Sequence, residues 1–426
     1  MPITATRSIA WMAMALILAL VVEGILRPRG LTLDFANFYD AGQKARAGEF
    51  TGLYDPFATI AGQPPFGNMS FFSAPLTSYF YIPLALLPPV LASMLFKLAG
   101  TLAQVLGLWL LYRTFAPLAG PAEEDRARFL ALFAVAALLF QPFWVIYGVG
   151  GQTTPFVFLM LVLAYLALQR GWFGWMAVLM SLVVVIKPAF APAAILLFLV
   201  LPNRFRLVAL ICGLGFGFGS FWVFGSDLHR QFLALVLGET SGLLAPWRNS
   251  SPFSWIEPLF VQPAEYDAPG HLPVLVRQIE TALRIGVATL IIISLIRHRR
   301  GVLKVPADRH VIFASAMLLA IVLSPVVWAH YLTLLFIPLA ALIALRRHLP
   351  GVAVALLAIA VVVAVGQNLI LLKALIRVIG TDSTGAILAL AVLKSLPAVL
   401  ILMVALFAHR GVRHALADPG WVRLAT

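Results

Sequence analysis

The stretch LDFANFYDAGQKARAGEFTGLYDP, Leu33 to Pro56, is one of the few polar segments in a very apolar chain. As a helix it would place apolar and small side chains three and four positions apart on one face: Phe35, Phe38, Tyr39 and Gly42. Its polar residues would fall largely on the other side. This pattern predicts a short helix lying in a membrane interface, with its apolar face toward lipid and Asp34 in its first turn.

The composition around this stretch is that of a membrane protein. Of the 426 residues, 62% are hydrophobic and 11% are charged, and the mean hydropathy is +0.98. Apolar runs of roughly 20 residues, long enough to cross a bilayer, recur along the chain. We therefore expect an all-α polytopic membrane protein that forms a single domain over residues 1–426. The lone Cys212 leaves no disulfide framework and no cysteine-based metal site.

The hydropathy pattern predicts about twelve transmembrane helices, the first an uncleaved signal anchor, with both termini in the cytoplasm. The fifth and sixth are short and meet at Lys187 and Pro188. The expected spans are 8–27, 90–112, 128–147, 154–169, 171–186, 188–202, 206–225, 278–296, 309–327, 331–345, 350–370 and 385–408.

The basic residues orient these spans. Seventeen of the 30 Lys and Arg fall in the termini and short loops assigned to the cytoplasm, as the positive-inside rule requires. The net charge of +13 therefore reflects membrane topology, and no basic patch interleaved with aromatic residues indicates nucleic-acid binding. The seventeen are Arg7, Arg113, Arg126, Arg128, Arg170, Arg204, Arg206, Arg297, Arg299, Arg300, Lys304, Arg309, Arg346, Arg347, Arg410, Arg413 and Arg423.

Two long loops lie on the extracytoplasmic side, at about residues 28–89 and 226–277. We expect them to carry short interfacial helices, one of them in the proline-broken run SYFYIPLALLPPV at residues 78–90. The cytoplasmic loops are too short to form a nucleotide-binding domain. Any chemistry is therefore expected outside, on the face that bears the long loops.

Asp34 is the principal candidate for that chemistry, because it follows the first span within a few residues. A carboxylate beside lipid and in reach of water could accept a proton from a hydroxyl group. It could equally cap the helix by accepting a hydrogen bond from the backbone N–H of Asn37. Both roles are open on the residues alone, whereas Asp40 and Asp55 are expected to be structural.

Five further residues are candidates for binding a substrate. Lys187 could hold a phosphate group as a cation or could snorkel to the headgroups, and Arg248 in the second long loop is similar. Gln152, after the glycines of GVGGQ, could bind a sugar hydroxyl or belong to a plain turn. His330 ends the ninth span beside Trp328 and Tyr331, an aromatic pair typical of an interfacial belt. Tyr39 completes the set.

At this point the residues resemble a known family. The order D-F-x-x-F-Y-x-A, then a Gly, then L-Y-D-P is similar to the polyprenyl-phosphate-dependent mannosyltransferases of glycosyltransferase family 87. Further fragments follow in the family's order: FYIPLALLPP, GQTTPFVFL, the Lys187-Pro188 pair, RNSS and SPVVWAHYLTLLFIPL. The similarity covers about residues 8 to 370 in spaced fragments.

The resemblance implies a GT-C-type fold with its active site in loops at the extracytoplasmic membrane surface. It implies a polyprenyl-phosphate sugar donor, commonly mannose, a lipid or glycan acceptor, and inversion at the sugar. It assigns the catalytic carboxylate to Asp34 and a later histidine to His330. A single Asp at this motif, rather than an acidic pair, argues against a metal, and no cofactor is expected. The implied location is the cytoplasmic (inner) membrane, with the site facing the periplasm or the exterior.

Two other classes of protein are compatible with the hydropathy pattern. A transporter or flippase of lipid-linked sugars would suit many spans, but such proteins usually show paired repeats and charges near the midplane. This sequence shows no repeat between its halves, and its polar residues gather at one membrane face. A non-catalytic scaffold would leave Asp34 and Lys187 unexplained.

The topology predicts which positions a membrane-impermeant thiol reagent reaches on intact cells. Cysteines introduced at Lys44 and Arg248 should be labelled, because both lie in the long outer loops. Cysteines at Arg299 and Arg346 should stay unlabelled. Labelling at position 299 but not at 44 would reverse the orientation.

Overall fold

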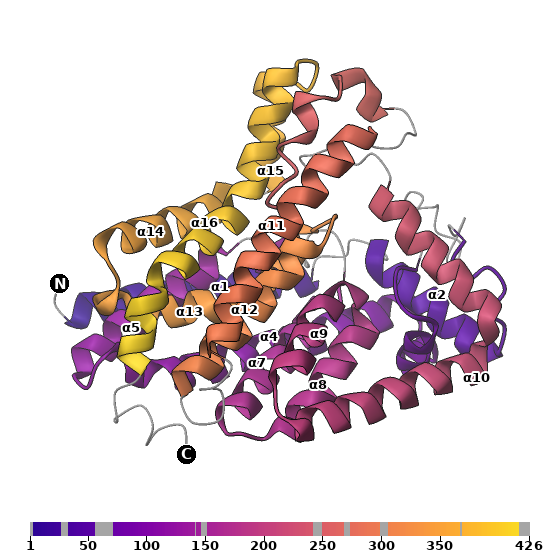
Figure 1. The fold of residues 1–426 in the computed structure, drawn as a ribbon, viewed down its shortest axis with the longest axis horizontal. Helices are drawn as coiled ribbons and strands as arrows, with labels where there is room; N and C mark the ends of the chain where they lie inside the picture. Colours follow the sequence, from indigo (N-terminus) through magenta and orange to yellow (C-terminus); the bar gives the residue numbers. More distant parts are fainter. Residues whose placement is uncertain are drawn as a thin grey trace.

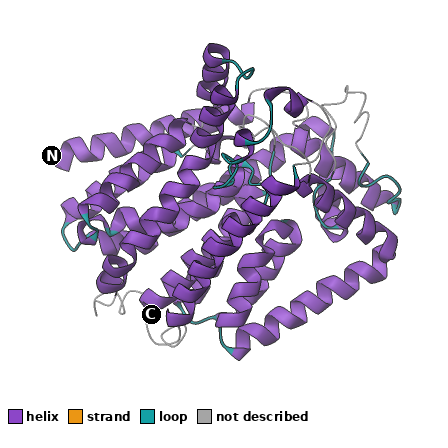
Figure 2. Cartoon of the chain, turned by 45° about the horizontal axis from the view of Figure 1, so that its top comes forward, coloured by secondary structure: helices purple, strands orange, loops and turns teal. Residues whose placement is uncertain are grey.

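A computed structural model describes residues 3–26, 33–55, 71–140, 142–145, 151–241, 249–267, 273–298, 306–366 and 369–416. Within these ranges the regular elements are all helices (Figure 2). The long ones are α1 (Ile3–Leu26), α4 (Pro89–Phe115), α5 (Glu123–Leu139), α7 (Thr154–Gln169), α8 (Phe173–Ile186), α10 (Asn203–Ser241), α11 (Val274–His298), α12 (Pro306–Leu323), α14 (Gly351–Gly366) and α16 (Thr384–Leu416). Shorter ones are α2 (Leu33–Ala47), α3 (Ile82–Ala85), α6 (Pro142–Val145), α9 (Ala191–Val200), α13 (Phe336–Ala344) and α15 (Leu369–Ile379).

Each expected span overlaps at least one of these helices. Three described helical stretches are long and apolar enough by themselves to cross a membrane: Ile3–Ile25, Pro89–Ala119 and Asn203–Val236. Five other apolar helices are shorter. The all-helical membrane architecture is therefore confirmed, whereas the number of spans stays a prediction.

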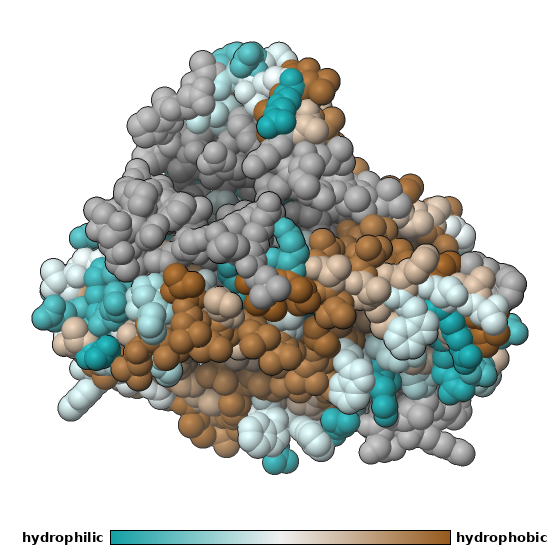
Figure 3. All heavy atoms as spheres, turned by 180° about the vertical axis from the view of Figure 1, so that it is seen from behind, coloured by the Kyte–Doolittle hydropathy of each residue, from teal (hydrophilic) through white to brown (hydrophobic). Residues whose placement is uncertain are grey.

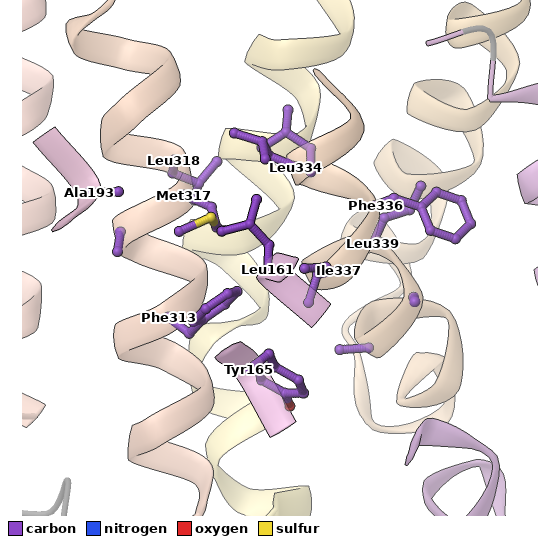
Figure 4. Packing of buried hydrophobic residues seen from close by; sticks show 14 of the residues in the cluster. Leu161, Tyr165, Ala193, Phe313, Met317, Leu318, Leu334, Phe336, Ile337 and Leu339 are labelled. Atoms are coloured by element: carbon purple, nitrogen blue, oxygen red, sulfur yellow. The ribbon is translucent and has the colours of Figure 1, made fainter. Parts of the chain in front are cut away.

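The main core is formed where α7 packs between α4, α8 and α12 (Figure 1). Figure 4 shows Leu161 and Tyr165 of α7 facing Phe313 and Met317 of α12, with Ile337 of α13 beside them. All five side chains are buried. Around this centre α1 packs on α5, α9 on α12, and α14 on α16.

The outside of the molecule is apolar over a broad band. Figure 3 shows hydrophobic atoms across the middle of one face and hydrophilic atoms toward its two ends. Large side chains such as Leu102, Trp109 and Trp222 are exposed. A surface of this kind is stable only where lipid or another apolar phase covers it.

The first long loop folds onto the protein through a cluster of aromatic side chains. Phe35 and Phe38 of α2 are almost fully buried. The ring of Phe38 stacks on that of Tyr81 in the 3-10 helix η1 (Pro75–Tyr81), with 4.8 Å between the ring centres. The ring centres of Phe35 and of Phe96 in α4 are 5.3 Å apart. The expectation that this face rests on lipid was therefore wrong: it rests on η1 and α4, whose aromatic side chains cover it.

The second long loop begins with a bend inside α10. Gly225 has a φ of 70°, in the left-handed region that glycine adopts without strain. The expected seventh span ends at this residue, and the chain continues as helix in a new direction (Figure 1). The bend brings Leu228 and Phe232 into the aromatic cluster of the first loop. The two long loops are thereby joined.

Gly42 sets how closely α2 approaches η1. A Cβ atom added at Gly42 would lie 2.6 Å from the carbonyl oxygen of Tyr81, which is backbone and cannot rotate away. We expect Gly42→Ala to destabilise the protein by about 1–3 kcal/mol, as overpacked cores do, and to lower its thermal unfolding temperature in detergent.

Gly213→Ala in α10 is the matched control, because a Cβ there meets nothing within 4 Å. Alanine should be neutral or slightly stabilising at this helical position. Equal unfolding temperatures for the two variants would contradict the close packing of α2 on η1.

Candidate active site

Asp34 is held at the start of α2 by the packing of the residues that follow it. The helix begins at Leu33, so Asp34 lies in the first turn rather than at the N-cap. The carboxylate is partly buried, and burial raises its pKa to about 6, while a hydrogen bond from Gln152 and the charge of Lys187 lower it. The helix N-terminus also favours a negative charge there. The result is a carboxylate that is ionised at neutral pH and still basic.

Lys187 is placed by the proline that follows it. A residue before proline is disfavoured in the helical region, and Lys187 accordingly has φ −135° and ψ 90° at the end of α8. Its side chain is 8% exposed. An ammonium group buried to this degree must find partners in the protein. Snorkelling to the headgroups is therefore not how this lysine is accommodated in the structure.

Gln152 joins the carboxylate to the ammonium. It precedes α7, whose start at Thr154 and Pro155 fixes the chain. Its Oε1 lies 3.4 Å from Lys187 Nζ, and its side chain is hydrogen-bonded to Asp34. An ammonium only donates hydrogen bonds and an ionised carboxylate only accepts them. The amide of Gln152 can therefore accept from Lys187 with its oxygen and donate to Asp34 with its nitrogen.

His330 and Tyr331 complete the surroundings of the ammonium. They lie in the 3-10 helix η9 (Ala329–Leu335). His330 Nε2 is 3.4 Å from Lys187 Nζ, so this nitrogen is the acceptor and the imidazole is neutral. The ammonium also lies 4.8 Å from the centre of the Tyr331 ring, within the range of a cation–π interaction.

Four of the six candidate residues thus gather in one place: Asp34, Gln152, Lys187 and His330. Tyr39 is elsewhere, since it is 3% exposed and its hydroxyl donates to the carbonyl oxygen of Leu87 at 2.8 Å. We assign it a packing role. Arg248 lies outside the described residues.

Three features of the surroundings were not singled out from the sequence. Tyr331 contributes its ring to Lys187 instead of serving only as an interfacial aromatic. Lys394 of α16 is buried and acts electrostatically on His330; a lysine inside an apolar helix is a signal that could have identified it. Within the second long loop, Glu257 is buried near the ion pair of Glu280 and Arg284, and burial together with Glu280 raises the pKa of Glu257 to about 9.

The arrangement offers a base and a cation that are joined through one amide side chain. A carboxylate with a pKa near the working pH is suited to general-base catalysis. A fixed ammonium suits a phosphate or another anion. Among the residues that the structure describes, no group of three or more His, Cys, Asp or Glu is placed to hold a metal ion.

Comparison with known protein families decides the class of enzyme. Residues 71–325, more than half of the chain, match the model of glycosyltransferase family 87. The chain belongs to glycosyltransferase family 87. No curated protein and no solved structure matches it.

A family 87 protein with this apolar helical architecture is a membrane glycosyltransferase, which uses a sugar donor and an acceptor. The matched segment contains Gln152 and Lys187. Asp34 and His330 lie on either side of it in the sequence, and the fold brings both to the matched residues. The site is therefore built from the family segment and its two flanks.

The bond from Gln152 predicts a pH effect. It favours the ionised form of Asp34, so Gln152→Leu should raise the pKa of Asp34 above about 6. If Asp34 must be ionised to act, activity falls as pH drops through this pKa. The acid limb of kcat/KM should therefore move to higher pH in the variant.

Gln104→Leu on α4 is the control, because Gln104 is also a buried amide. Its acid limb should match that of the unmodified protein. If the acid limb of kcat/KM in Gln152→Leu stays where it is in the unmodified protein, Gln152 does not influence the pKa of Asp34.

Proposed function

We propose that this protein transfers a sugar from a polyprenyl-phosphate donor to a hydroxyl group of a lipid or glycan acceptor, with inversion at the anomeric carbon and with Asp34 as the general base. Mannose is the first sugar to test. The observation that supports the proposal best is the connection of Asp34 through Gln152 to Lys187, a base and an anion-binding cation held in fixed relation.

The proposed step forms one bond and breaks one. The acceptor oxygen attacks the anomeric carbon as the bond from that carbon to the phosphate oxygen breaks. Asp34 takes the proton of the attacking hydroxyl, and the lipid phosphate leaves with the electron pair. The leaving phosphate is a stable anion, so it needs no proton from the protein.

Lys187 is proposed to bind that phosphate. The donor carries one negative charge on its phosphodiester, and the departing monoester gains another, so a fixed ammonium favours the later state. Preorganised charge of this kind often contributes more to catalysis than any other single effect. The 3.4 Å contacts of Lys187 to Gln152 and His330 are long for hydrogen bonds. The ammonium, which has three donors, therefore keeps hydrogen-bonding capacity for a phosphate while these two partners hold its position.

We place the site at the extracytoplasmic face of the cytoplasmic membrane. The charge bias of the loops supports this location. So does the position of Asp34 in the first of the two long loops, where it is joined through Gln152 to Lys187. A polyprenyl tail can stay in lipid there while the sugar reaches water.

Asp34→Asn tests the proposal. A positioned base contributes roughly 10²–10⁴-fold, so transfer from a polyprenyl-phosphate sugar should fall by about that factor. The amide keeps the size of the carboxylate, and the variant should fold and still bind the donor. Turnover near the unmodified rate would assign the base to another group, with His330 next.

Asp40→Asn is the matched control. Asp40 lies on the same helix, nearly two turns along, and pairs with Lys44 at 2.9 Å in a partly exposed ion pair. Such pairs contribute about 0.3–0.5 kcal/mol, so most activity should remain. Equal losses in the two variants would point to damage to α2 rather than to loss of a base.

A further inference from the structure

We propose that Asn249 is a positioning residue of this site, which fixes the backbone that carries His330 and, through His330, holds the ammonium of Lys187. The inference rests on the proposed function. It concerns the second long loop, where Asn249 follows the candidate residue Arg248 in the sequence.

The amide of Asn249 makes three hydrogen bonds. Its Oδ1 accepts from the backbone N–H of Val327 at 2.9 Å and of Ser251 at 3.0 Å. Its Nδ2 donates to the carbonyl oxygen of Pro325 at 3.1 Å. The N–H of Ser250 also donates to the carbonyl oxygen of Val327 at 2.7 Å. Asn249 is 2% exposed.

The segment that receives these bonds has no helix of its own. α12 ends at Leu323 and η9 begins at Ala329, so the backbone groups of Pro325 and Val327 lie outside both helices. Val327 is fully buried, and buried backbone groups must be bonded. Arg284 is a second, weaker brace, with Nη2 3.5 Å from the Pro325 oxygen. Asn249 and Ser250 therefore supply hydrogen bonds to the backbone of Pro325 and Val327, in the gap between the two helices.

His330 follows Val327 by three residues and depends on that backbone for its position. Its Nε2 is the nitrogen that lies 3.4 Å from Lys187 Nζ. None of the hydrogen bonds described for Asn249 reaches Asp34, Gln152 or Lys187. Asn249 therefore acts through His330, not on the substrate.

The test uses the purified full-length protein and N,N′-dicyclohexylcarbodiimide, an apolar reagent that modifies protonated carboxyl groups. Labelling of Asp34, read by mass spectrometry against pH, follows the protonation of its carboxylate without any turnover. In the unmodified protein labelling should decline through pH about 6. In Asn249→Ala, Lys187 loses its fixed partner and favours the ionised carboxylate less, so labelling should persist to higher pH.

Ser254→Ala is the matched control. The Ser254 hydroxyl is buried and donates to the carbonyl oxygens of Asn249 and Ser251, both at 3.0 Å, without touching the 325–327 segment. It should leave the labelling midpoint unchanged. Asn249→Asp keeps the accepting oxygen but loses the donation to Pro325, so it should give a smaller shift than alanine and serves if the alanine variant does not fold.

Transfer activity separates this inference from the proposed function. A misplacement near 1 Å costs about 10²-fold in rate, and we expect a loss of that order for Asn249→Ala. If Asn249→Ala folds and its labelling midpoint is unchanged, or shifts no more than that of Ser254→Ala, the positioning role is overturned. A shifted midpoint in a protein that transfers nothing from polyprenyl-phosphate sugars would support the positioning and overturn the function.

Discussion

The site depends on one constraint, the burial of the Lys187 ammonium. A cation removed from water is costly unless the protein supplies its own polar groups. Here the amide of Gln152, the imidazole of His330 and the ring of Tyr331 do so, and the charge of Asp34 lies in reach. Apart from the neighbours His330 and Tyr331, these residues come from different parts of the chain. The lysine therefore organises residues that the sequence separates widely.

These groups are held by helix breaks and by aromatic packing. Pro188 ends α8 at the lysine, and the Asn249 bonds support the break before His330. The bend at Gly225 returns α10 to the cluster of Phe35 and Phe38. The helical core carries the framework, and the breaks position the polar side chains of the site. This division is typical of membrane proteins, where irregular backbone is found only inside protein or beside a cavity.

The sequence predicts the helical membrane class, the family and four of the gathered residues, because hydropathy and short motifs are local signals. The sequence predicted that lipid covers the apolar face of α2. This was wrong because helical periodicity shows that a face is covered but cannot distinguish lipid from protein as the covering phase. We treated Tyr331 as an interfacial aromatic and gave Asn249 no task. Their partners, Lys187 and the 325–327 backbone, are remote in sequence, and contacts of this kind follow only from the tertiary fold.

The most direct test of the account is a transfer assay in proteoliposomes, with a panel of polyprenyl-phosphate sugars compared with nucleotide sugars as donors. The account predicts that sugar leaves a polyprenyl phosphate and appears on the acceptor, and that nucleotide sugars do not replace that donor. Transfer from a nucleotide sugar alone would contradict it. So would passage of a lipid-linked sugar across the bilayer with the bond between sugar and phosphate intact.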